Sequence, residues 1–195
     1  DNLLQEIKSG DYSNLMYAMG KAVLNRLASE RTEGLRELLE NLFDESKDLT
    51  ERVKFFDKQS LKLYRELESK LDNHQDERSI SAYLTLRNPE KYTFYKYAFY
   101  NNYCKLLGIK QAKKNERYTH YITLIDELIE NYIIPDKELI EQIKSYIPQY
   151  YDGSNHKLLV QDILYQMLDK NAEMPVSTTS KTNEQLYWLY SPGEN

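Results

Sequence analysis

The sequence predicts an all-α protein, a globular domain of about seven or eight helices. Glycine and proline together account for only 11 of the 195 residues, about half of their usual share of roughly 12%. Apolar residues make up 41% of the chain and recur at the three- and four-residue spacing of amphipathic helices. At this length that apolar fraction is enough to build a core.

Three helices of the first half have simple boundaries. The first is expected over residues 11–28 and the second over residues 32–44, each with an apolar stripe on one face. Another starts near residue 76 and ends before Asn88-Pro89, because proline disfavours helical geometry in the residue before it and has no N–H to donate.

The clearest helix is expected over residues 49–71. Asp48 precedes it as a capping acceptor, and Glu51 stands at the third following position. Leu71 closes the apolar stripe. The charged side chains between the apolar positions, Arg52 among them, are expected to be solvated.

Four more helices are expected in the second half, over residues 94–107, 117–133, 136–147 and 158–168. Gly108 suits the left-handed position after a helix. Pro135 and Pro148 mark helix boundaries, and residues 152–155 form a turn.

The composition changes after Lys170, which predicts three parts. Residues 1–170 form the helical domain, and residues 171–184 are polar, rich in Ser and Thr, and are expected to be a linker. Residues 185–195 resemble the first strand of a further domain, which the sequence given does not complete.

Charge is unevenly distributed along an acidic chain. The net charge is −5, yet residues 91–118 carry seven basic residues against the single acid Glu116, so this segment has a charge of +6 and the remainder −11. A basic strip on an acidic body can bind a polyanion locally. The candidate DNA-binding residues are Lys105, Lys110, Lys113, Lys114, Arg117, Lys91 and Lys96. A solvated charged face is the alternative.

Aromatic residues interleave with these lysines in residues 89–103. The residues concerned are Tyr92, Phe94, Tyr95, Phe99 and Tyr103. Such rings can stack on bases, but packing is the favoured interpretation, because aromatic rings bury much area while tyrosine hydroxyls reach solvent. We expect Tyr92, Phe94 and Phe99 to be mainly buried, with Pro89 in the turn between two helices.

Catalytic patterns are missing from the sequence. It contains no Gly-x-x-x-x-Gly-Lys-Ser/Thr phosphate loop, so no cofactor is expected. The histidines His74, His120 and His156 lie in separate segments, and we interpret them as surface residues rather than metal ligands. The lone Cys104 is interpreted as a small buried residue that suits a reducing compartment. Pro135-Asp136 resembles the opening of a nuclease site, but capping is the favoured role of Asp136.

Two stretches resemble a known family. They are Asn88-Pro89-Glu90-Lys91-Tyr92-Thr93-Phe94-Tyr95-Lys96, followed by Tyr103-Cys104-Lys105-Leu106-Leu107-Gly108, and the C-terminal Tyr187-Trp188-Leu189-Tyr190-Ser191-Pro192-Gly193-Glu194-Asn195. Both resemble the N-terminal region of bacterial proteins related to McrB, the AAA+ GTPase of modification-dependent restriction. The helix from Lys157 to Leu164 is also similar to the one that closes that region. In that group a helical region precedes an EVE-like domain of PUA-like fold, and the AAA+ motor follows.

The resemblance implies a non-catalytic module at the DNA-facing end of a cytoplasmic system that defends against foreign DNA. Its partners would be DNA, including DNA with modified bases, and a nuclease subunit. No run of about 18 apolar residues is present, so no membrane partner is expected. The alternative is a helical protein-interaction or spacer module that positions the neighbouring domain or a partner subunit.

Overall fold

The computed structural model describes residues 5, 7, 9, 10, 14–67 and 70–168, and the regular elements in this part are helical. They are α2 (Ala18–Glu30), α3 (Thr32–Phe43), α4 (Leu49–Arg65), α5 (Glu77–Arg87), α6 (Tyr97–Leu107), α7 (Arg117–Leu128), η1 (Ile129–Ile133), α8 (Lys137–Tyr146) and α9 (His156–Leu168). The all-α prediction is confirmed. The expected linker and strand in residues 171–195 lie outside the described residues.

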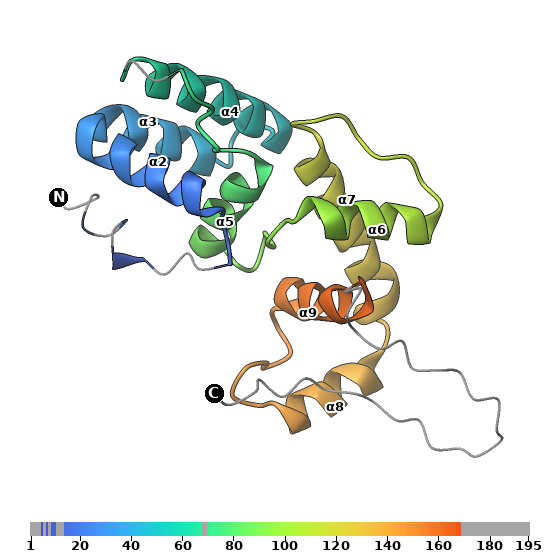
Figure 1. The fold of residues 1–195 in the computed structure, drawn as a ribbon. Helices are drawn as coiled ribbons and strands as arrows, with labels where there is room; N and C mark the ends of the chain where they lie inside the picture. Colours follow the sequence, from blue (N-terminus) through green and yellow to red (C-terminus); the bar gives the residue numbers. More distant parts are fainter. Residues whose placement is uncertain (1–4, 6, 8, 11–13, 68–69, 169–195) are drawn as a thin grey trace.

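The helices form two neighbouring groups around one core (Figure 1). In the first group α3 packs against α2 and α4, and α5 packs against α3 and α4. In the second group α9 packs against α6, α7 and η1, and α8 follows at the far end. Contacts between α5 and α7 join the two groups.

Local sequence signals explain most of the helix boundaries. The Asp48 carboxylate accepts a hydrogen bond from the N–H of Glu51 at 3.1 Å and caps α4. The Asp136 carboxylate accepts from the N–H of Leu139 at 2.9 Å and caps α8, as expected for a capping residue. Gly108 has φ of +67° and ends α6 in the left-handed conformation.

Two helices start later than their apolar stripes predict. Asn14 has φ of +64° in a turn, and α2 begins only at Ala18. Before α6, side-chain hydrogen bonds hold the chain extended. Both the N–H of Phe94 (2.8 Å) and the hydroxyl of Thr93 donate to the side-chain oxygen of Gln161 on α9. The N–H of Tyr95 also donates to the Ser81 hydroxyl of α5 at 3.0 Å, so residues 93–95 are held against α9 and α5, and α6 starts at Tyr97 rather than at residue 94.

The expectations for the helix at 49–71 are wrong at two residues. Arg52 is only 4% exposed, because its guanidinium donates to the carbonyl of Leu42 at 2.7 Å and to the hydroxyl of Tyr92 at 2.9 Å. Helix α4 ends at Arg65, and Leu71 is 64% exposed instead of closing the stripe.

The aromatic segment is mainly structural. Tyr92, Tyr95 and Tyr103 are buried in the core, whereas Phe94 and Phe99 are only half-buried. The expectation that Phe94 and Phe99 are mainly buried is therefore wrong. The ring of Phe99 stacks on Tyr165 of α9, which is itself half-buried, with ring centroids 4.2 Å apart. Pro89 lies in the turn between α5 and α6, as expected.

Candidate nucleic-acid interface

The predicted DNA-binding residues divide into two sets. Lys105 in the last turn of α6 and Lys110, Lys113 and Lys114 in the segment before α7 have exposed side chains. None of these four forms an ion pair with another described residue within 4.0 Å, although Lys113 lies close enough to Glu116 to help lower the pKa of that carboxyl. We call Lys105, Lys110, Lys113 and Lys114 the basic strip.

The other three cations have partners within the fold. Lys91 forms an ion pair with Glu45. The Lys96 ammonium lies over the ring of Tyr165 at 4.8 Å, and the Arg117 guanidinium lies 4.8 Å from the ring centroid of Tyr97. Cation–π contacts of this kind hold a side chain in place. The three cations are therefore less free than the basic strip to meet a phosphate.

Hydrogen bonds hold the segment that carries Lys110, Lys113 and Lys114 against α6 and α4. The N–H of Ala112 donates to the hydroxyl of Tyr100 at 2.7 Å. The side-chain amide of Asn115 donates to Asp57 on α4 at 2.9 Å, and Asn115 itself has φ of +66°. Anchoring the backbone on its inner side leaves the lysines directed outward.

A buried carboxylate lies beneath this segment, at the start of α7. Glu77, the first residue of α5, is 6% exposed and accepts a hydrogen bond from the N–H of Tyr118 at 2.9 Å. Burial raises the pKa of Glu77, and hydrogen bonds from backbone N–H groups, that of Tyr118 first, oppose the shift. This carboxylate replaces the N-terminal cap that Glu116 does not supply to α7.

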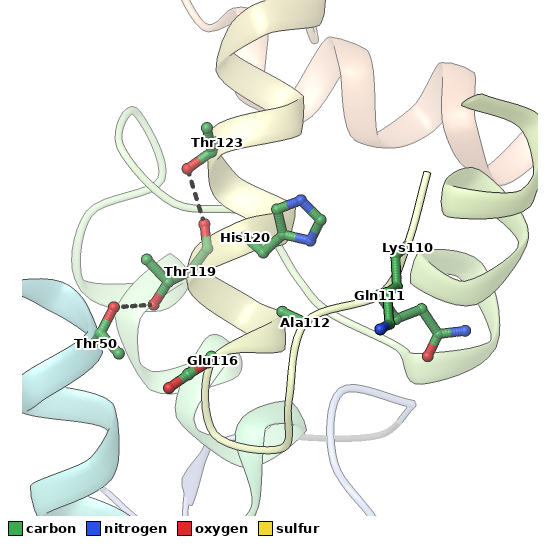
Figure 2. Close-up of a pocket in the computed structure, with 8 residues that line it drawn as sticks. All are labelled: Thr50, Lys110, Gln111, Ala112, Glu116, Thr119, His120 and Thr123. Atoms are coloured by element: carbon green, nitrogen blue, oxygen red, sulfur yellow. Dashed lines mark hydrogen bonds between the residues drawn. The ribbon is translucent and has the colours of Figure 1, made fainter. Parts of the chain in front are cut away.

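A groove adjoins the basic strip, between the first turn of α4, α7 and residues 110–112 (Figure 2). Its volume is about 480 Å³. The lining residues are Thr50, Lys110, Gln111, Ala112, Glu116, Thr119, His120 and Thr123. The hydroxyls of Thr50 and Thr119 are 3.2 Å apart and join α4 to α7.

The acidic residue that lines the groove, Glu116, is paired with Lys54 of α4. The Lys54 ammonium lies 2.6 Å from a carboxylate oxygen of Glu116, and this hydrogen-bonded contact lowers the pKa of the Glu116 carboxyl. Lys110, at the opposite wall, has no such partner among the described residues. Of the residues that line the groove, Lys110 therefore carries the charge that is not paired with another described residue.

The half-buried, hydrogen-bonded positions of His120 and His156 are the main feature that could not be predicted from the sequence. His120 is half-buried, and its Nδ1 lies 2.8 Å from the hydroxyl of Tyr100, which is fully buried. Burial raises the pKa of Tyr100 to about 12. His156 forms a similar pair with Tyr151 at 2.8 Å. A separation of 20 residues between Tyr100 and His120 leaves no sequence signal, because tertiary packing alone brings them together.

The remaining chemistry of the described residues is limited. Cys104 is buried, and burial raises the pKa of its thiol. Within ranges 14–67 and 70–168 and the few described residues before them, no three His, Cys, Asp or Glu side chains are grouped to hold a metal ion. No helix in that part of the chain has the length and apolar character needed to cross a membrane.

Comparison of the chain with protein-family models, curated proteins and solved structures finds no match.

Proposed function

We propose that this chain is the non-catalytic, DNA-engaging N-terminal module of a McrB-like restriction NTPase. The observation that carries the proposal is the basic strip, four exposed lysines in one short stretch of a chain whose net charge is −5. Lysines contact phosphates as point charges, which position a protein on DNA without reading its bases. The expected binding is therefore weak and nearly independent of sequence.

The proposal extends to the setting of the module. The complete protein would be a bacterial cytoplasmic AAA+ NTPase that works with a restriction endonuclease subunit. An EVE-like domain following the helical domain would recognise the modified base, and the helical domain would add phosphate contacts. The resemblance of residues 88–108 and 187–195 to that group supports this arrangement.

Charge reversal tests the DNA role. We expect Lys110→Glu, Lys113→Glu and Lys114→Glu together to abolish binding to a duplex, because each lost phosphate contact also removes one released counterion. Three such contacts contribute about 3 to the wild-type slope of log K against log salt concentration. Binding of a fluorescent 20-base-pair duplex at several salt concentrations measures the affinity and the salt slope, and a thermal melt shows whether the variant is folded.

A matched control separates local contact from total charge. Lys62, Lys70 and Lys137 are exposed and lie outside the basic strip, so their reversal changes the net charge equally. The control triple variant should retain most of the wild-type affinity and salt slope. If wild-type protein shows no binding at low salt, or if both triple variants lose binding equally, a DNA role for the strip is excluded.

The alternative is a protein-interaction or spacer module, and one surface favours it. Tyr132, Tyr146 and Tyr150 are 69%, 66% and 78% exposed near η1 and α8. Tyrosine is enriched at protein interfaces, where its ring supplies apolar area and its hydroxyl a hydrogen bond. Salt-insensitive self-association in sedimentation velocity, lost on Tyr146→Ser and Tyr150→Ser, would support this reading. A monomer at all concentrations would argue against self-association through this surface.

A further inference from the structure

We infer that the groove between α4 and α7 binds a phosphate group of a nucleic-acid strand, held by Lys110 and the imidazole of His120. The inference rests on the proposed DNA role and extends it from a diffuse positive surface to a defined position. Figure 2 shows the His120 ring directed toward the Lys110–Gln111 wall, with Thr119 directed toward Thr50 on the other side.

The hydrogen bond with Tyr100 determines what His120 offers to the groove. The Tyr100 oxygen accepts from the N–H of Ala112 and lies 2.8 Å from Nδ1 of His120, and we assign the hydroxyl proton to Nδ1, the nitrogen acceptor within reach. In the neutral ring the other hydrogen is then on Nε2. No described residue accepts a hydrogen bond from this Nε2.

The other polar groups of the groove select an acceptor-rich, anionic ligand. The Gln111 oxygen accepts from Tyr97 at 3.1 Å, and its nitrogen donates one of its two hydrogens to Asn101. The Glu116 carboxylate is held by Lys54. The donors that remain include the second Gln111 N–H, the His120 Nε2–H and the Lys110 ammonium, and a phosphate oxygen accepts from all three types.

The position of the groove fits a strand rather than an isolated ion. It is open along one side and bordered by the segment that carries Lys113 and Lys114. A strand with one phosphate at His120 can place the neighbouring phosphates against these lysines. The basic strip then supplies electrostatic attraction, and the groove supplies the one contact that depends on geometry.

Single and double substitutions in the full chain test the assignment. We expect Lys110→Ala and His120→Ala each to weaken DNA binding about 5- to 20-fold at low salt, as for loss of a charge-assisted hydrogen bond. If both groups hold the same phosphate, the double variant loses less than the product of the two single effects. His156→Ala is the control, because His156 forms an equivalent pair with Tyr151 outside the groove, and it should change affinity less than 2-fold.

Ring signals of the histidines provide a readout that does not depend on variants folding. The chain has only three histidines, so proton NMR distinguishes them during titration with inorganic phosphate and with an oligothymidylate. We expect saturable shifts of His120 with both probes and none of His74 or His156. Unchanged His120 signals, with His120→Ala binding DNA normally, would overturn the phosphate site while leaving the DNA role intact. A His120 shift with inorganic phosphate but no DNA binding would remove the DNA role and leave only an anion site.

Discussion

Replacing Glu77 should separate the value of its hydrogen bond from the cost of its charge. Glu77→Ala leaves the N–H of Tyr118 without an acceptor. The site is buried, since Glu77 is only 6% exposed. An unsatisfied buried N–H costs about 1–3 kcal/mol, and lost packing adds about 1 kcal/mol. The free energy of unfolding should therefore fall by about 2–4 kcal/mol, which for a chain of this size lowers Tm by roughly 4–16 °C.

Glu77→Gln should behave differently, because glutamine keeps the acceptor oxygen and removes the charge. Burial raises the pKa of Glu77, so the fold favours the neutral form. The stability that this group contributes is fully present below its unfolded pKa of about 4.3, and is lost as pH rises through the higher folded pKa. At neutral pH we expect Glu77→Gln to change stability by less than about 1 kcal/mol.

Urea unfolding of both variants and wild type between pH 4 and pH 7 measures these effects. Carboxyls with lowered pKa, such as Glu45 and Glu116, give the wild type an opposite trend. That trend is common to both proteins and cancels when the free energy of unfolding of wild type is subtracted from that of Glu77→Gln. The remaining difference should shift in favour of the variant as pH rises. Equal destabilisation by alanine and glutamine, or a difference that shifts the other way, would refute the reasoning.

Three further substitutions test packing at other places in the fold. Gly20→Ala should destabilise by about 1–3 kcal/mol in a urea melt, because its Cβ would lie 3.0 Å from the backbone oxygen of His74; unchanged stability would mean that this loop yields readily. Phe94→Ala should cost only about 1–2 kcal/mol, since the ring is half-buried, against about 3–5 kcal/mol for a fully buried aromatic. Gln161→Leu removes the acceptor for Thr93 and Phe94 and should cost about 1–3 kcal/mol; hydrogen exchange at Phe94 should rise with it, and unaltered exchange would show that α9 does not hold this segment.

Much of the fold could be predicted from the sequence because its signals are local. The capping carboxylates Asp48 and Asp136 act on N–H groups three residues away, and Gly108 acts through its own backbone. Apolar spacing likewise acts within a single helix. The number of helices and most of their boundaries could therefore be predicted from the sequence. The exposed basic strip was also predictable, since a run of lysines in a turn is costly to bury.

Only the tertiary structure decided the features that depend on distant partners. Arg52 is buried because Tyr92, 40 residues away, accepts its hydrogen bond, and no pattern near Arg52 indicates this. The extended segment before α6 exists because Gln161 binds it from α9. His120 becomes part of a groove only when α7 packs beside α6 and Tyr100 fixes its ring. The sequence by itself therefore determined the helices and the charge of their surface, whereas long-range hydrogen bonds determined which polar side chains are buried and which face the candidate site.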